Sequence, residues 1–239
     1  MALKHISLNN MEFDISYIMQ NNKKDSFAVF LHGWGANKEL MQDCFKESFK
    51  NYNHLYIDLP GFGNSSNSYI LDSNDYRNII ESFLIEIDIK PTIIIGHSFG
   101  GKIATLLNPK ILVLLSSAGI PKVRSLKTKI KIRLAKICNF FGVSSRIFRT
   151  KDALNLPQNM YEILKIVIKE DFSDIFGNFH NKAFIFWGEN DYITPLYMAN
   201  KIHSVMKHSK LYVLEGDHYF FLHNANKIDR IVNGNDGVK

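Results

Sequence analysis

Cysteine is scarce in this sequence: the chain of 239 residues contains two, Cys44 and Cys138. Neither has a neighbour at metal-ligand spacing, and two cysteines cannot form a disulfide framework, so we expect buried free thiols in a reducing compartment. No uncharged apolar run approaches the roughly 18 residues that a membrane-spanning helix needs. Residues 1–15 also lack the basic and then apolar pattern of a secretion signal. These absences together predict a cytoplasmic protein.

Acidic residues are missing from one stretch of the chain. Residues 122–151 contain ten lysines and arginines but no aspartate or glutamate, although the whole chain has 23 acidic and 29 basic residues. The net charge of +6 therefore comes from a mildly acidic body that carries one basic segment.

Apolar runs typical of buried strands alternate with helical patterns over most of the chain. Strands are predicted at 27–31, 54–59, 92–95, 111–115, 183–187 and 210–214, preceded by two short strands at 5–10 and 11–19. Helices are predicted at 38–49, 75–87, 195–206 and 219–232, with a further helix after residue 98. This alternation predicts one α/β domain, a mostly parallel sheet with helices on both faces.

Residues 122–177 interrupt the alternation, because they contain helical patterns without a strand between them. Helices are predicted there at 126–141, 144–150 and 159–168. We therefore expect a helical insertion at 122–177 between two parts of the core, residues 1–121 and 178–239.

The central predicted strand ends in the motif G-H-S-F-G-G at residues 96–101. In a nucleophile elbow, glycines two positions before and after the serine let a strand and a helix approach without Cβ clashes. The serine would also lie at a helix N-terminus, which favours developing negative charge. Ser98 is the candidate nucleophile; the alternative is an ordinary glycine-rich turn between a strand and a helix.

A serine hydroxyl needs a general base, commonly a histidine that a carboxylate holds in one tautomer. Asp191 and His218 follow the last two predicted strands, and the order Ser98, Asp191, His218 is the order expected for an elbow enzyme. Glu189 is the alternative acid. Two other histidines adjoin these motifs, and we expect His97 to pack or hydrogen-bond behind the elbow and His32 to brace its own loop.

An oxyanion hole needs two N–H donors aimed at the developing charge. The residue after the nucleophile, Phe99, supplies one backbone N–H. The loop after the strand at 27–31 contains Gly33 and Gly35, and we expect the backbone N–H of Trp34 to be the second donor. The alternative is an ordinary loop between a strand and a helix.

Taken together, these motifs resemble those of α/β-hydrolases. The matching stretches are H-G-W-G at 32–35, D-L-P-G-F-G-N-S at 58–65, G-H-S-F-G-G at 96–101, W-G-E-N-D at 187–191 with T-P at 194–195, and G-D-H at 216–218. The resemblance implies the α/β-hydrolase fold, the roles given above for Ser98, Asp191, His218, Trp34 and Phe99, and a lid at 122–177 between the sixth and seventh strands. Serine rather than aspartate at the elbow excludes the family members that form alkyl-enzyme intermediates.

The chain also resembles, in H-G-W-G and in its basic insertion, the pimeloyl-carrier-protein methyl ester esterases of biotin synthesis. That resemblance implies that an acidic acyl carrier protein is bound by lid arginines, here Arg124, Arg133, Arg146 and Arg149. The alternatives are a solvated helix face or contact with an anionic membrane surface. Nucleic acid is not expected, because no motif of interleaved aromatic and basic residues occurs.

The sequence therefore predicts a serine carboxylesterase that hydrolyses a small ester or acyl substrate through an acyl-enzyme, without a metal or cofactor. Two alternatives remain open. One is a hydrolase of carbon–carbon bonds in dienoic ketoacids, and the other is a non-catalytic ligand-binding protein with a hydrolase fold.

Overall fold

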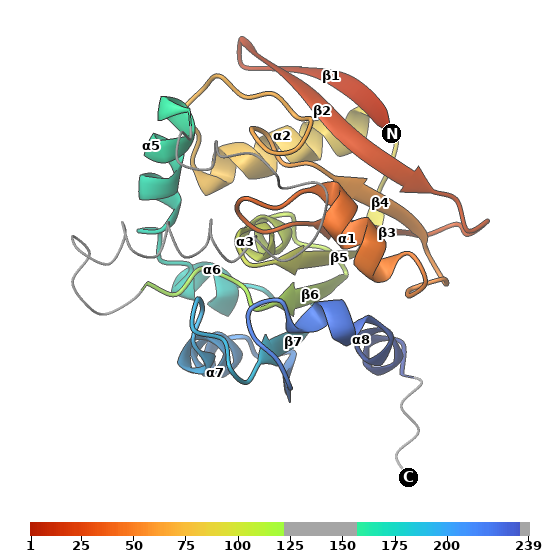
Figure 1. Cartoon of the computed structure of the whole chain (residues 1–239), viewed down its shortest axis with the longest axis vertical. Helices are drawn as coiled ribbons and strands as arrows, with labels where there is room; N and C mark the ends of the chain where they lie inside the picture. The colour runs from red at the N-terminus through yellow and green to blue at the C-terminus, as the bar shows by residue number, and fades with distance from the viewer. Residues whose placement is uncertain (122–156, 235–239) are drawn as a thin grey trace.

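The structure, a computed structural model, describes residues 1–121 and 157–234. One eight-stranded sheet runs through the molecule in the order β1-β2-β4-β3-β5-β6-β7-β8 (Figure 1). Strand β2 is antiparallel to both β1 and β4, and all the pairs from β4 onwards in this order are parallel. The strands are β1 (Ala2–Leu8), β2 (Met11–Gln20), β3 (Phe27–Leu31), β4 (Asn53–Ile57), β5 (Pro91–His97), β6 (Ile111–Leu115), β7 (Lys182–Gly188) and β8 (Ser209–Leu214).

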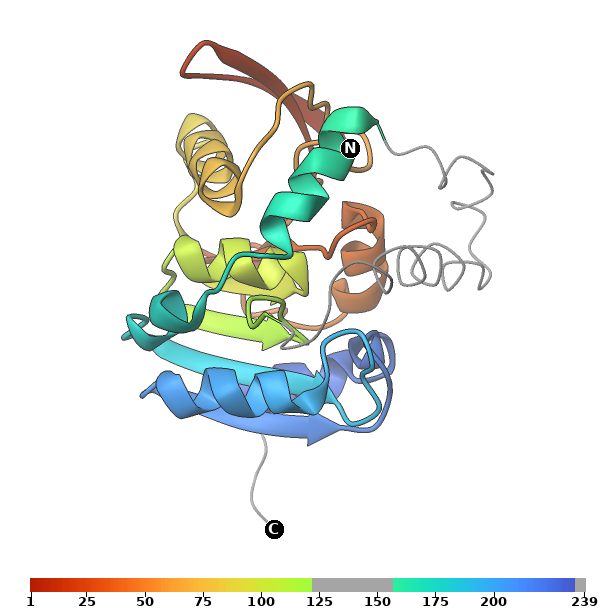
Figure 2. The same ribbon diagram turned by 90° about the vertical axis from the view of Figure 1, so that its left-hand side faces the viewer.

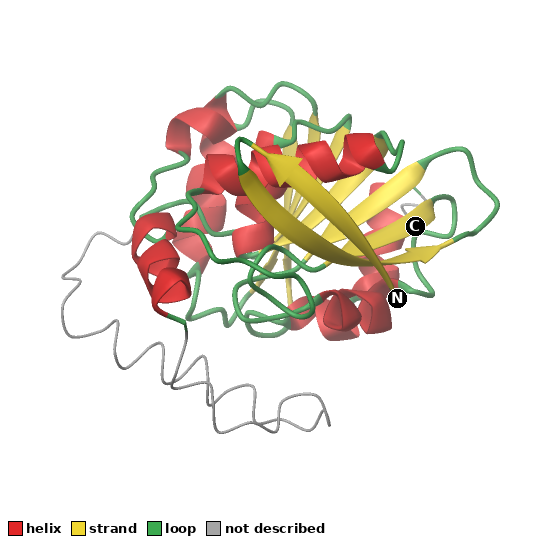
Figure 3. Cartoon of the chain, turned by 90° about the horizontal axis from the view of Figure 1, so that it is seen from above, coloured by secondary structure: helices red, strands yellow, loops and turns green. Residues whose placement is uncertain are grey.

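Helices cover both faces of this sheet, as Figure 3 shows from above. One apolar core lies between the sheet and α2 (Ser73–Glu86), α3 (Phe99–Leu106), α5 (Gln158–Val167), α6 (Ser173–Gly177) and α7 (Leu196–Val205). A second core lies on the other face, under α1 (Lys38–Phe45), the 3₁₀ helix η2 (Phe220–His223) and α8 (Ala225–Val232). The predicted mostly parallel sheet with two covered faces is confirmed.

Strand β3 marks the point where the direction of winding changes. The chain passes from β3 to β4 on one side and then returns to β5 on the other side of β3. Ligands of open α/β sheets bind at such a switch point, beyond the carboxyl ends of the strands. The carboxyl ends of β3 and β5 lead into the 33–35 loop and Ser98, respectively.

Local backbone preferences explain where several elements begin and end. Asn9 and Asn10 have φ of 51° and 61°, which gives the predicted turn of the first hairpin its tight two-residue form. Helix α2 begins earlier than predicted because Asp72 and Asp75 form a capping box at its N-terminus. Helix α1 ends at Phe45, short of the predicted residue 49.

The predicted helix at 219–232 is wrong as a single element. The structure has η2 and then α8, separated by Asn224, whose φ of −121° lies outside the helical region. The Asn224 amide donates to the Phe220 carbonyl at 2.7 Å, so the side chain satisfies backbone that a continuous helix would have satisfied.

Part of the predicted insertion lies within the described residues. The helix expected at 159–168 is confirmed as α5, and Figure 2 shows it extending away from α6, a short helix that the sequence did not predict. The helices predicted at 126–141 and 144–150, and the four candidate arginines, lie outside the described residues. Within the described ranges, no helix is long and apolar enough to cross a bilayer.

Candidate active site

Ser98 occupies a sharp turn between β5 and α3. Its φ of 49° and ψ of −111° lie outside the ordinary regions for a side-chain-bearing residue, which stores strain at this position. A Cβ on Gly96 would lie 2.5 Å from the carbonyl oxygen of Gly100, and a Cβ on Gly100 would lie 2.5 Å from the carbonyl oxygen of Leu31. Both positions therefore require glycine, and the predicted strand, turn and helix are confirmed.

Asp191 and His218 meet at the carboxyl ends of β7 and β8. The His218 Nδ1–H donates to Asp191 Oδ2 at 2.7 Å, and both residues are 4 % exposed. This bond fixes the neutral tautomer and leaves the Nε2 lone pair free to accept a proton.

The Asp191 carboxylate accepts three further hydrogen bonds. Thr194 Oγ1 donates to Oδ2 at 2.8 Å, and the backbone N–H groups of Ile193 and Thr194 donate to Oδ1 at 2.8 and 2.9 Å. Burial by itself raises the pKa of Asp191, but the hydrogen bond and charge of His218 and the other donors outweigh it and hold the pKa below its ordinary value. The carboxylate therefore stays ionised beside the imidazole.

Of the two candidate acids, Asp191 alone contacts His218 within the described residues. Glu189 is exposed, and its carboxylate accepts from the Asn190 amide at 3.1 Å. The loops after β7 and β8 approach so closely that a Cβ on Gly188 would lie 2.0 Å from the Asp217 carbonyl oxygen.

His97 connects the elbow to the loop that carries His218. Its Nε2–H donates to the His218 carbonyl at 3.1 Å, and the two ring centroids lie 4.7 Å apart. Burial, and then the proximity of His218, lower the pKa of His97 well below its ordinary value, so this ring is neutral. The expectation that His97 packs and hydrogen-bonds behind the elbow is confirmed.

The Ser98 hydroxyl forms no hydrogen bond with the His218 ring among the described residues. Nucleophile–base contacts are often long without a substrate and shorten in the reacting complex. The structure thus brings the His218 loop against the residue next to Ser98, and the serine–histidine contact stays a prediction.

The two loops predicted to form the oxyanion hole lie together beside Ser98. The rings of Trp34 and Phe99 meet edge to face with centroids 5.6 Å apart, and a Cβ on Gly33 would lie 3.1 Å from Ser98 Cβ. Phe99 is the first residue of α3, so its N–H has no partner within that helix. The placement fits two donors near one oxygen, and their role stays a prediction.

Comparison with known proteins decides the family. The sequence profile of the alpha/beta hydrolase family matches residues 28–228. The chain belongs to the alpha/beta hydrolase family. The predicted α/β-hydrolase fold is therefore confirmed.

Two curated relatives match part of this hydrolase. A putative esterase/lipase 2 of Mycoplasma pneumoniae is 28 % identical over 99 residues, which are 40 % of this chain and 37 % of that protein. A 2-succinyl-6-hydroxy-2,4-cyclohexadiene-1-carboxylate synthase of Escherichia coli is 32 % identical over 80 residues, 34 % of this chain and 31 % of that protein. The matched stretches thus span about a third of each relative.

Solved structures match nearly the whole hydrolase chain. An esterase from Exiguobacterium antarcticum has a TM-score of 0.74 at 18 % identity, covering 94 % of this chain and 95 % of that one. A bromoperoxidase from Bacillus anthracis has a TM-score of 0.75, also at 18 % identity, with 98 % of both chains covered. Likeness at this level of identity shows the shared fold.

His32 and a buried ion pair hold the loops around the hydrolase site. The His32 Nδ1–H donates to the Gly33 carbonyl at 2.7 Å and Nε2 accepts from the Leu59 N–H at 3.0 Å, so the bracing role expected of His32 is confirmed. The Lys38 ammonium contacts the Asp58 carboxylate at 2.6 Å, and both side chains are fully buried. Sequence reasoning missed this pair because nothing in the spacing of residues 38 and 58 indicates that they meet.

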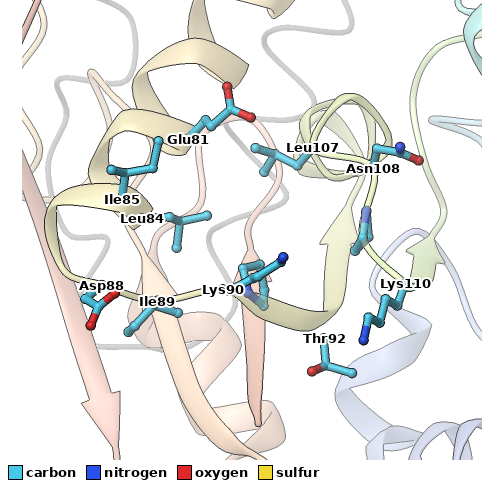
Figure 4. A pocket seen from close by; sticks show the side chains of 12 residues that line it. Glu81, Leu84, Ile85, Asp88, Ile89, Lys90, Thr92, Leu107, Asn108 and Lys110 are labelled. Atoms are coloured by element: carbon cyan, nitrogen blue, oxygen red, sulfur yellow. The ribbon is translucent and has the colours of Figure 1, made fainter.

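A separate groove of about 620 Å³ lies beside the amino end of the central strand β5 (Figure 4). Its lining includes Pro91 at the start of β5, Leu107 after α3 and Ile85 near the end of α2. Because Ser98 follows the other end of β5, this groove is not part of the candidate active site.

Proposed function

We propose that this protein is a serine carboxylesterase that works through an acyl-enzyme intermediate. The observation that carries the proposal is the buried hydrogen bond from His218 to the Asp191 carboxylate, on a loop that His97 ties to the elbow of Ser98. The matched relatives include a protein named as a putative esterase/lipase, which supports ester hydrolysis.

In the proposed first half-reaction, Ser98 Oγ attacks the ester carbonyl carbon while His218 Nε2 takes the hydroxyl proton. The Asp191 carboxylate stabilises the imidazolium that forms. The backbone N–H groups of Trp34 and Phe99 donate to the carbonyl oxygen as it gains negative charge. When the tetrahedral intermediate collapses, His218 gives the proton to the leaving alcohol, and the acyl group stays on Ser98.

In the second half-reaction, water attacks the acyl-enzyme with His218 as the base. Collapse of this second intermediate releases the carboxylic acid and returns the proton to Ser98. Besides the substrate and water, the proposed chemistry uses only side chains and backbone of the chain.

The test uses three variants and a panel of p-nitrophenyl esters. Ser98→Ala should lower kcat at least about a thousandfold without unfolding the protein, and Asp191→Asn should lower it by a factor on the order of 10⁴ because the histidine tautomer is lost. Glu189→Gln is the matched control and should retain activity. A fluorophosphonate probe should label the native wild-type protein and not Ser98→Ala.

Retained ester hydrolysis in Ser98→Ala would refute the proposal. Absence of both hydrolysis and labelling in the wild type would favour a non-catalytic binding protein instead. Cleavage of a dienoic ketoacid with no ester hydrolysis would identify the carbon–carbon bond hydrolase instead.

We propose further that the substrate is a methyl ester carried by an acidic acyl carrier protein in the cytoplasm. The support is the basic segment at 122–151, including Arg124, Arg133, Arg146 and Arg149. Reversing these four charges to glutamate should lower turnover of the carrier-linked ester while a small ester is hydrolysed at the wild-type rate. Equal loss on both substrates, or loss on neither, would count against the carrier.

A further inference from the structure

Lys102 is a buried cation with no part in the proposed reaction. It lies on α3, four positions after Ser98, and is 1 % exposed. A buried ammonium strongly destabilises the fold unless it is paired and hydrogen-bonded. Its partners should therefore show what this lysine holds in place.

The partners of Lys102 lie on the segment that links α5 to α6. The ammonium donates to the Val167 carbonyl at 2.8 Å and forms an ion pair with the Glu170 carboxylate. It also lies 4.3 Å from the centroid of the Phe172 ring, a cation–π contact in a dry setting. Three contacts thus fix the backbone and side chains of residues 167–172 against the elbow helix.

Glu170 extends the connection to a third helix. Its Oε1 accepts from the Ser73 N–H at 3.1 Å and its Oε2 from the Ser73 hydroxyl at 2.5 Å. Ser73 is the first residue of α2, where a carboxylate is favoured by the helix dipole. One carboxylate therefore joins α2, α3 and the segment after α5.

The same segment is hydrogen-bonded to the loop after β6, which in turn contacts the elbow. The Phe172 N–H donates to the Gly119 carbonyl at 2.8 Å, and the Ala118 N–H donates to the Ser98 carbonyl at 2.9 Å. Through these bonds the position of residues 167–172 depends on the backbone around Ser98.

Helix α5 reaches from this anchor to the loop beside the proposed oxyanion donor. Met160 is 2 % exposed and its sulfur would lie 2.4 Å from a Cβ on Gly61. Phe62, the residue after Gly61, packs against Trp34 with the two ring centroids 4.9 Å apart. A shift of α5 would therefore move the apolar wall next to Trp34.

We infer that Lys102 is a positioning residue, which through Glu170 sets α5 and the 61–62 loop against Ser98 and so controls binding of long acyl chains. The inference rests on the proposed esterase function. On this inference the far end of a long acyl chain would lie against the wall next to Trp34, so its binding should respond to a shift of α5 while that of a short chain does not.

The experiment compares Lys102→Met with Glu162→Gln, which removes a partly exposed ion pair to Lys165 within helix α5. In Lys102→Met, amide hydrogen exchange in α5 should rise about tenfold or more, while Glu162→Gln stays within about twofold of the wild type. For p-nitrophenyl decanoate, kcat/KM of Lys102→Met should fall about tenfold or more, mainly through KM, while p-nitrophenyl acetate and fluorophosphonate labelling change less than about threefold.

Each result bears on one claim. Unchanged α5 exchange, or an equal loss on both esters, would overturn the positioning role. If the wild type neither hydrolyses esters nor reacts with the fluorophosphonate, the proposed function fails, and hydrogen exchange still decides whether Lys102 holds α5. Should Lys102→Met not fold, the double variant Lys102→Met/Glu170→Leu removes both charges and takes its place.

Discussion

At the residue scale, the two ring nitrogens of His97 meet different surroundings. Nε2–H donates to the His218 carbonyl, whereas Nδ1 is buried without a hydrogen-bond partner and faces Gly33, on which a Cβ would lie 2.7 Å away. Protonating Nδ1 would place a cation in a dry position beside a second imidazole. We therefore expect the ring to stay neutral, with its hydrogen bond holding the His218 loop against the elbow.

This environment predicts a pH dependence of stability. The unfolded chain protonates His97 near its ordinary pKa of about 6.5, while the folded protein holds the pKa well below that value. The unfolding free energy therefore has its full value above a pH of about 6.5 as far as His97 is concerned. It decreases as the pH falls below that value, because the unfolded state binds the proton first. Wild type should lose unfolding free energy faster than His97→Asn between about pH 7 and 5, measured by urea titration.

The other buried histidines with lowered pKa, His32 and His54, are present in both proteins and cancel in the comparison. Parallel stability curves for the wild type and His97→Asn would contradict the assignment of a neutral buried ring.

At the element scale, the strand–turn–helix around Ser98 depends on backbone proximity. Strand β5 and helix α3 approach so closely that a methyl group on Gly96 meets both the carbonyl of Gly100 and, at 2.7 Å, the Cα of Gly101. Neither neighbour is a flexible side chain, so the strain cannot be relieved by a rotamer change.

Gly96→Ala should therefore destabilise the protein by about 1–3 kcal/mol or more and displace Ser98, with loss of esterase activity. Gly177→Ala is the matched control, since its Cβ would meet Val205 at an ordinary 4.0 Å. Thermal unfolding and activity of the two variants test the difference. Equal stability of the two would show that the elbow has room that the backbone distances do not allow.

At the scale of the whole molecule, a fully buried ion pair holds the loops on the active-site side of β3 and β4. Asp58 accepts from the Lys38 N–H at 2.7 Å, the Lys38 ammonium at 2.6 Å and the Asn64 N–H at 2.9 Å. Burial lowers the pKa of Lys38, but the bonds to Asp58 and Glu39 outweigh it and raise the pKa above its ordinary value. The Lys38 ammonium therefore remains charged in the interior.

Asp58→Asn leaves the Lys38 ammonium buried without its main counter-charge and should cost about 3–5 kcal/mol of unfolding free energy. Asp43→Asn breaks an exposed pair with Lys46 on the same helix, where the N–O distance is 3.5 Å, and should change stability little. Denaturant unfolding of both variants gives the comparison. Similar losses in the two would mean that Asp58 is better hydrated than its burial implies.

The fold class and most element positions follow from the sequence, because they depend on local patterns. Periodic apolar residues located the eight strands of the described residues and α5 within a few residues, and the glycines at 96 and 100 identified the elbow. The 219–232 helix was wrong because the Asn224 side chain competes with the backbone, an interaction that periodicity does not register.

The sequence alone located the candidate residues, since Ser98, His218 and two possible acids, Asp191 and Glu189, each follow a predicted strand in a recognisable motif. Only the tertiary structure decided between Asp191 and Glu189, and only it joined Lys102 to Glu170 and Lys38 to Asp58. The physical reason is that a motif is local along the chain, whereas the choice of a hydrogen-bond partner or a counter-charge depends on which distant segments the packed sheet places side by side.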